Sequence, residues 1–405
     1  MIFMFKISKA DSLIFNLFSL WLIVDTLNGF LLRNDIPISV SQVYKLFVAI
    51  FVLAHCYKHN KVKILFAWMV LYLSLYTVNI IWRGEEITSS LILISKFLTS
   101  LLFFYYFTLV ANTYPIYFKK EALKVFKVNI LVFSGNILLG LIGIGYHSYT
   151  EIDGIGYCGF FYAINEMSGV VATLFPWAFY LLKDKFSIRK YYLASTMLFI
   201  IAFLMSTKSG MLATILSFIF ITFTYGRKSE KIFISIGTIL LVIIAAIYIQ
   251  VLLSSDVGVI QRFSWFLDQN GVVDAITSGR LSFWEEEGHE FYDAGFVSQI
   301  FGLGGNRTVE MDPYDALLNC GLIGVGFLAY IYYYFICQPL KKRVKTLDYS
   351  KVVWISNFAL IIISVIGGHI LFSSMAGLFI ALSNSTLYCC NEKNISNSQF
   401  ISFKR

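Results

Sequence analysis

The chain is 405 residues long, 58% of them hydrophobic and only 14% charged, with a mean hydropathy of +0.73. A water-soluble core of this size cannot accommodate so much apolar side-chain surface, so lipid is expected to be the main solvent. The net charge of +8 comes from short basic clusters scattered between apolar runs. Because they form no continuous basic stripe, nucleic acid is not the expected partner.

Apolar stretches of about 17 to 25 residues recur along nearly the whole chain, each long enough to cross ~30 Å of hydrocarbon as a helix. They predict an all-α polytopic membrane protein with about twelve transmembrane helices. The expected spans are residues 12–32, 37–56, 63–82, 87–112, 124–146, 159–182, 191–207, 210–225, 232–253, 314–337, 352–369 and 372–390. The boundaries near Lys208 and Gly367 are the tightest, because two apolar runs nearly join there.

The distribution of Lys and Arg gives this topology a direction, because cytoplasmic connections retain positive charge. Of the 32 basic residues, 24 lie at the two ends of the chain or on alternate connections, beginning with the one between the second and third spans. Six lie on the remaining connections, and Lys45 and Lys96 lie inside spans. Both termini are therefore expected in the cytoplasm.

One hydrophilic stretch, residues 254–312, is much longer than the other connections and falls on the external side of this topology. Its aromatic and apolar content predicts an ordered, partly helical loop. The expected organisation is a membrane bundle over 1–253, a large external (periplasmic) loop over 254–312, a second bundle over 313–390 and a cytoplasmic tail over 391–405.

Four ionisable residues lie inside predicted spans: Asp25, Lys45, Lys96 and Glu166. All four lie at a similar depth, roughly 10 to 14 Å below the outer boundary, which predicts a polar cavity open to the outside. Two interpretations stay open. Asp25 with Lys45, and Lys96 with Glu166, can form ion pairs between helices, or the lysines can bind a lipid-linked phosphate.

The external connections carry further cations, Arg262 and Arg280 in the long loop and Lys208 in a short turn. Arginine on the exported side opposes the topology bias, so phosphate or pyrophosphate binding is one explanation and solvated loop charge is the other.

Three carboxylates, Glu310, Asp312 and Asp315, follow at the mouth of the next span. They can bind a cation, supply a general base or cap a helix. A cap explains Asp312 best, because Pro313 suits the first helical position, and this leaves Glu310 and Asp315 for chemistry. His289 and His369 are also external and are expected to be structural.

Several short motifs between Phe160 and Gly324 share a pattern with one known group of enzymes. They are Asn165-Glu166, Ser206-Thr-Lys208-Ser-Gly210, Arg262, Ser278-Gly-Arg280 followed by Trp284, Gly302-Leu-Gly304-Gly305, and Glu310 through Gly321-Leu-Ile-Gly324. On these residues and its topology the chain resembles the bacterial O-antigen polymerase and ligase superfamily. Ligases commonly carry a histidine where this chain has Glu310, and an arginine where it has Lys208. Both departures favour a polymerase and keep the ligase as the alternative.

The resemblance implies a GT-C-like, metal-independent, inverting glycosyltransferase of the bacterial inner membrane, without a cofactor. It would transfer a glycan from an undecaprenyl-pyrophosphate-linked donor to a second lipid-linked repeat unit at the periplasmic face, in contact with membrane lipid and a chain-length regulator. The implied roles are pyrophosphate binding by Arg280, Arg262, Lys208, Lys45 and Lys96, a general base at Glu310 or Asp315, and a cavity lined by Asp25, Glu166 and Asn165. A lipid-linked oligosaccharide flippase or transporter, and a membrane subunit without chemistry, remain alternatives.

Overall fold

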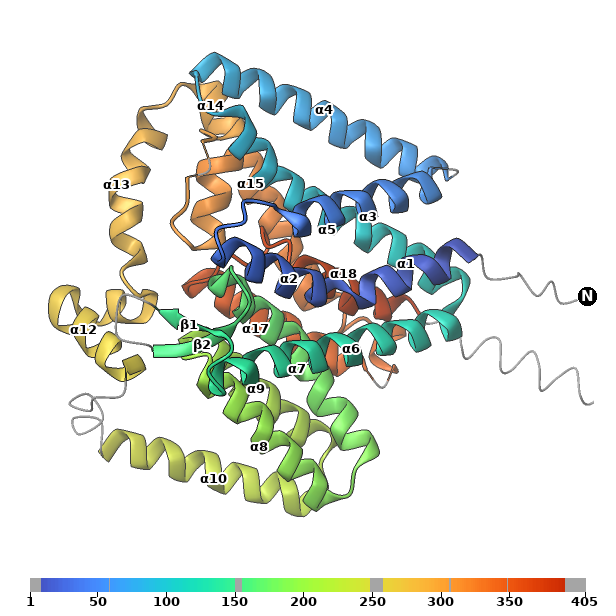
Figure 1. The fold of residues 1–405 in the computed structure, drawn as a ribbon, viewed down its shortest axis with the longest axis vertical. Coiled ribbons are helices and arrows are strands. Elements are labelled where there is room, and N and C mark those ends of the chain that lie inside the picture. Colours follow the sequence, from blue (N-terminus) through green and yellow to red (C-terminus); the bar gives the residue numbers. More distant parts are fainter. Residues whose placement is uncertain are drawn as a thin grey trace, which may run out of the picture.

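The computed structural model describes residues 9–57, 59–149, 155–247, 258–305, 307–347 and 349–389, and within them the fold is all-α apart from one short hairpin (Figure 1). Five of the described helices are long and apolar enough to cross a membrane, and a sixth crossing results if one bent pair of helices is a single span. The chain is therefore a multi-pass membrane protein.

The first predicted span, residues 12–32, is that bent pair. Helices α1 (Lys9–Ser19) and α2 (Trp21–Arg33) meet at an angle of 44°. Ser19 Oγ donates to the carbonyl of Phe15 at 3.0 Å, a back-bond that commonly bends helices. The next four helices are α3 (Val40–Cys56), α4 (Asn60–Arg83), α5 (Ile87–Thr113) and α6 (Pro115–Leu141).

A two-stranded antiparallel hairpin, β1 (Tyr146–Tyr149) and β2 (Ile155–Gly159), separates α6 from α7 (Ile164–Lys185). The helices that follow are α8 (Ile188–Leu204), α9 (Lys208–Tyr225) and α10 (Lys228–Ile247). Residues 167–179 of α7 are all buried, and this helix packs against α6, α8, α9 and α17 (Ser350–Ile366). A helix that is buried on every side forms the centre of the bundle.

The stretch predicted as a long loop contains three described helices, α12 (Gly258–Thr277), α13 (Arg280–Asp293) and α14 (Phe296–Phe301). Helices α12 and α13 lie with the hairpin at one end of the bundle, at the left of Figure 1, whereas α1 begins at the opposite end. After them come α15 (Asp312–Cys337), the short α16 (Lys342–Lys345) and α17.

The last two predicted spans, 352–369 and 372–390, differ most from the structure. Helix α17 ends at Ile366, and ten residues separate it from α18 (Gly377–Ser385), which is followed by the 3-10 turn η1 (Thr386–Tyr388). Together α18 and η1 rise about 18 Å, well short of a ~30 Å hydrocarbon layer. Residues 367–376, called the α17–α18 segment below, are irregular.

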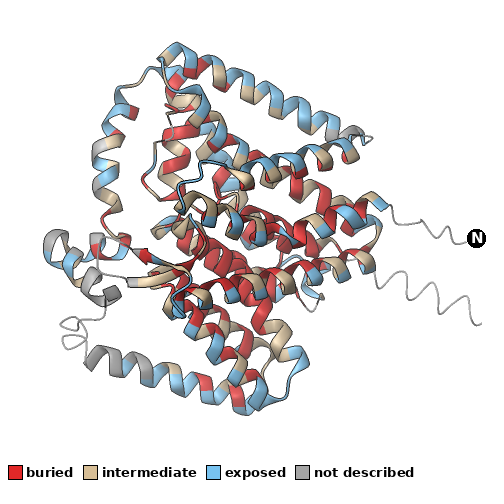
Figure 2. Cartoon of the chain, viewed as in Figure 1, coloured by how far each residue is buried: buried red, intermediate tan, exposed pale blue. Residues whose placement is uncertain are grey.

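Buried residues gather on the helices in the middle of the bundle, around α7, and exposed residues lie on the outer helices (Figure 2). Every residue of α18 is buried, whereas the described parts of α4 and α10 are exposed along most of their length. Their exposed side chains are largely apolar; Trp82 on α4, for example, is 90% exposed. Lipid is the solvent that suits such surfaces.

We expect Gly29→Ala to lower the apparent melting temperature, because a Cβ at Gly29 would lie 1.7 Å from the carbonyl oxygen of Phe160 and push α2 off the chain that follows β2. Gly135→Ala is the matched control, since a Cβ there meets nothing within 4 Å. It is expected to be neutral or to stabilise α6 by about 0.5–1 kcal/mol. Thermal unfolding in detergent, followed by size-exclusion chromatography, compares the two; equal melting temperatures would contradict the packing of α2.

Candidate functional site

The α17–α18 segment is irregular backbone buried inside a membrane protein. Ile370, Ser373 and Ala376 are fully buried. Peptide groups that leave a helix in such surroundings cost several kcal/mol each unless protein groups satisfy them. The side chains that satisfy this segment are therefore the first part of the site.

The carboxylate of Asp312 holds the first half of the segment. It accepts hydrogen bonds from the backbone N–H groups of Ile370 and Leu371, both at 3.1 Å, and from the hydroxyl of Ser364. The expectation that Asp312 caps its own helix is wrong: Met311 occupies the cap position, and no side-chain cap bond forms. Asp312 is fully buried because the α17–α18 segment needs its oxygens.

Glu166, at the start of α7, holds the second half. Its Oε2 accepts hydrogen bonds from the hydroxyl of Ser373 and from the N–H of Met375, the latter at 3.1 Å. Ser373 Oγ in turn accepts from the N–H of Ala376 at 3.0 Å. A carboxylate at this place is favourable, because the unpaired N–H groups at the beginning of α18 carry partial positive charge.

The ionisable residues predicted inside spans form two ion pairs that converge on the same segment. Lys45 Nζ lies 2.7 Å from Asp25 Oδ1 and donates to Ser374 Oγ at 3.2 Å. Lys96 Nζ lies 3.9 Å from Glu166 Oε1. Of the two interpretations left open, the structure shows the pairing between helices. Lys45 is 8% exposed, whereas the side chain of Lys96 is 28% exposed and faces a less enclosed space.

Arg280, Glu310 and Asn165 meet beside this segment, although they come from three distant parts of the chain. Arg280 Nη2 lies 2.9 Å from Glu310 Oε2, and Asn165 Nδ2 donates to Glu310 Oε1 at 2.5 Å. The Nη1 of Arg280 also lies 2.7 Å from the position that a Cβ would take on Gly367. The guanidinium thus rests on the backbone where the α17–α18 segment begins.

Lys208 fixes the turn that presents Arg280. Its ammonium donates to the carbonyl of Ala275 at 2.9 Å and to Ser278 Oγ at 3.1 Å. Ser278 and the following Gly279 both have positive φ, which makes this a sharp turn directly before α13. Arg262 belongs to α12, and its side chain lies outside the part of the chain that the structure describes.

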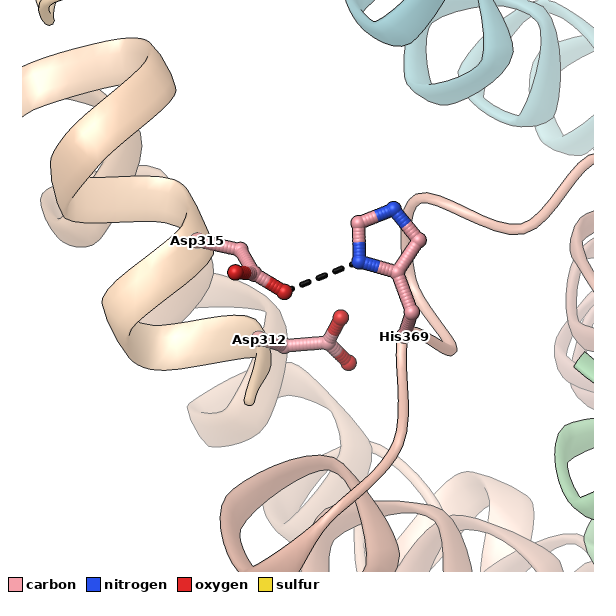
Figure 3. A group of neighbouring side chains, drawn as sticks. All are labelled: Asp312, Asp315 and His369. Atoms are coloured by element: carbon pink, nitrogen blue, oxygen red, sulfur yellow. Dashed lines mark hydrogen bonds and ion pairs between the residues drawn. The ribbon is translucent and has the colours of Figure 1, made fainter. Parts of the chain in front are cut away.

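Asp315 and His369 form a second hydrogen-bonded pair (Figure 3). His369 Nδ1 lies 2.8 Å from Asp315 Oδ2, and the other ring nitrogen points away from both aspartates. The remaining oxygen of Asp315 accepts the N–H of Val309 at 2.6 Å. The carboxylates of Asp315, Asp312 and Glu166 are the charged groups closest to the His369 ring.

Ligand atoms of Asp312, Asp315 and His369 lie within 4.8 Å of one another. This is the spacing of a metal site, yet both aspartates already accept hydrogen bonds from the backbone, as described above. The cluster is therefore held together by its own hydrogen bonds, and its geometry does not require an ion.

Sequence reasoning brought out the charged residues but missed His369, Ser373 and Ser374 as parts of one site. A signal was present: residues 367–376, Gly-Gly-His-Ile-Leu-Phe-Ser-Ser-Met-Ala, place glycines and small polar residues between two apolar runs. Such residues favour irregular backbone over helix.

The site thus combines Arg280 and Glu310, the pair of Lys96 and Glu166, and the pair of Asp315 and His369, all packed around the α17–α18 segment. In comparisons with known proteins, no family model and no curated protein matches this chain. The geometry and the chemistry of these side chains are therefore the basis for a functional assignment.

We expect Asp312→Asn to destabilise the protein by about 1–3 kcal/mol, because the new amide NH2 would face the donors of Ile370, Leu371 and Ser364 and leave at least one of them without an acceptor. Asp293→Asn, at an exposed position of α13, makes the same chemical change and is expected to have little effect. Apparent melting temperatures in detergent test this. Indistinguishable variants would show that Asp312 does not hold the segment.

Proposed function

We propose that the protein is a polysaccharide polymerase of the O-antigen type, a glycosyltransferase that uses a glycan linked to undecaprenyl pyrophosphate. In this proposal the chain crosses a bacterial inner membrane about twelve times, residues 254–312 lie on the periplasmic side, and the site around the α17–α18 segment opens to that side. The basic connections of the topology and the cluster of charged side chains around the α17–α18 segment support it.

The observation that carries the proposal is the incomplete hydrogen bonding of the Arg280 guanidinium. Its Nη2 binds Glu310, its Nη1 donates to the carbonyl of Thr277 at 2.9 Å, and its Nε–H is buried without a hydrogen-bond partner among the described residues. A buried donor without an acceptor is costly, so its presence calls for an explanation. A phosphate oxygen of a bound ligand would supply the missing acceptor.

The reaction requires positive charge where the leaving group develops negative charge. Arg280 meets this need from a fixed position, because Glu310 and the backbone of Thr277 hold it. Lys96, which is partly exposed and only loosely paired at 3.9 Å, can turn toward a pyrophosphate without a large change. Lys45, which is buried and closely paired, supports the fold of the site instead.

Arg280→Ala is expected to abolish polymer formation, because the leaving pyrophosphate would lose its principal cation; removal of one such donor typically costs about 10²–10³-fold in rate. Purified protein in proteoliposomes is incubated with lipid-linked oligosaccharide extracted from the strain that carries the gene, and products are separated as a ladder on a gel. Arg189→Ala, on an exposed position of α8, is the matched control and should leave the ladder intact.

The same assay separates the alternatives. A wild-type protein that gives no ladder but moves the lipid-linked oligosaccharide across the bilayer would be a flippase. A wild-type protein that transfers glycan only to lipid A-core would be a ligase. Wild-type chain lengths from Arg280→Ala would overturn the role given to this arginine.

Gly367→Ala tests the placement of Arg280 without touching any charge. The added Cβ would lie 2.7 Å from Arg280 Nη1, so the flexible end of the arginine must move away from Glu310. The φ of Gly367 is 165°, an extended conformation open to alanine, and we therefore expect a nearly unchanged melting temperature but at least tenfold slower polymer formation. Full activity of this variant would mean that the position of Arg280 on Gly367 is unimportant.

A further inference from the structure

The pair formed by Asp315 and His369 has the geometry of an oriented base. Asp315 is fully buried, and its two oxygens are both occupied, one by the backbone of Val309 and one by His369 Nδ1. The carboxylate therefore fixes the ring and leaves the other nitrogen directed away from the aspartates (Figure 3). A buried aspartate that orients a histidine in this way is the arrangement by which proteins prepare a proton acceptor.

This pair lies next to the arginine site. Met311 and Gly368 form a parallel β-bridge, which places Glu310 and His369, the residues beside them, on neighbouring stretches of chain. Arg280 touches Gly367, two residues before the histidine. The ring of His369 stacks on Phe372, with 5.8 Å between ring centroids, and its side chain remains 16% exposed.

Glu310 is one of the two proton acceptors expected from the sequence, with Asp315 as the other, and both of its oxygens have partners in the structure. One of its oxygens accepts from Asn165 and the other forms the ion pair with Arg280. Both oxygens of Glu310 are therefore already engaged by side chains of the site. Glu310 is thus better suited to position Arg280 than to remove a proton.

We propose that His369 is the group that removes the proton from the attacking hydroxyl, with Asp315 as the residue that positions it. This inference rests on the proposed glycosyl transfer. The acceptor oxygen forms a bond to the anomeric carbon of the donor, and the bond from that carbon to the pyrophosphate oxygen breaks. The pyrophosphate leaves with the electron pair, and the hydroxyl proton goes to the free ring nitrogen of His369 and then to water.

The charged groups around the histidine set its behaviour with pH. Asp312 and Asp315 face it from α15 and Glu166 faces it from α7; beyond them lie Lys96, paired with Glu166, and Arg280, against Gly367. The three carboxylates favour the protonated ring. The rate should rise with pH as the ring loses its proton and becomes able to accept one from the hydroxyl.

His369→Asn is the sharpest variant, because the asparagine amide can still donate to Asp315 as Nδ1 does, yet it cannot accept the proton. We expect the melting temperature to stay close to that of the wild type and the polymerisation rate to fall about 10²–10⁴-fold. His289→Asn, at an exposed position of α13, is the matched control and should retain the wild-type rate.

Asp315→Asn gives a second, independent readout. Removal of one of the three carboxylate charges should shift the inflection of the pH–rate profile to lower pH, while the maximal rate falls because the ring is no longer oriented. A merely structural aspartate would lower the amount of folded enzyme without moving the inflection.

The outcomes separate this inference from the function on which it rests. If the wild-type protein forms no product from lipid-linked oligosaccharide at any pH, the proposed function fails. If the wild type is active and His369→Asn keeps its rate and its pH profile, the function stands and the role of His369 is overturned. A His369→Asn protein that melts normally but is inactive, together with a shifted profile for Asp315→Asn, supports both.

Discussion

The structure depends on how ten residues of irregular backbone are kept inside an apolar bundle. Two carboxylates from different helices accept its backbone hydrogen bonds, Asp312 those of Ile370 and Leu371, and Glu166 that of Met375. Without them, several peptide N–H groups would face hydrocarbon or tightly packed side chains, at a cost of several kcal/mol each. The polar side chains of the site follow from this requirement, because Lys45, Glu166 and Asp312 each bind a group of the segment.

This constraint also explains why two ion pairs lie next to the segment. Asp25 with Lys45, and Lys96 with Glu166, compensate one another, so that the segment is surrounded by paired ions. Buried pairs of this kind contribute little to net stability, because desolvation offsets most of their attraction. These pairs hold the segment in place instead, because Lys45 binds Ser374 and Glu166 binds Ser373. They thereby fix the backbone next to Arg280.

Much of the fold can be predicted from the sequence, because the length and hydropathy of a helix are local properties. The long helices α4, α5 and α15 lie close to the predicted spans. Asn165, Arg280 and Glu310, singled out together by the family resemblance, meet in space. The break between the last two predicted spans was expected to be only two residues long, whereas it covers residues 367–376, because an average over a window conceals a few glycines and serines between apolar runs. The role of Asp312 was missed for a different reason: its partners lie 58 and 59 positions further along the chain.

The central claim is that a lipid-linked pyrophosphate binds at Arg280, beside the α17–α18 segment. Cryo-electron microscopy of the protein in lipid nanodiscs with undecaprenyl pyrophosphate tests it most directly. The account predicts density for the pyrophosphate within hydrogen-bond distance of the Arg280 guanidinium, with Lys96 turned toward it and the Asp315–His369 pair unchanged. Pyrophosphate density elsewhere in the bundle, with no phosphate oxygen near the Arg280 guanidinium, would contradict it.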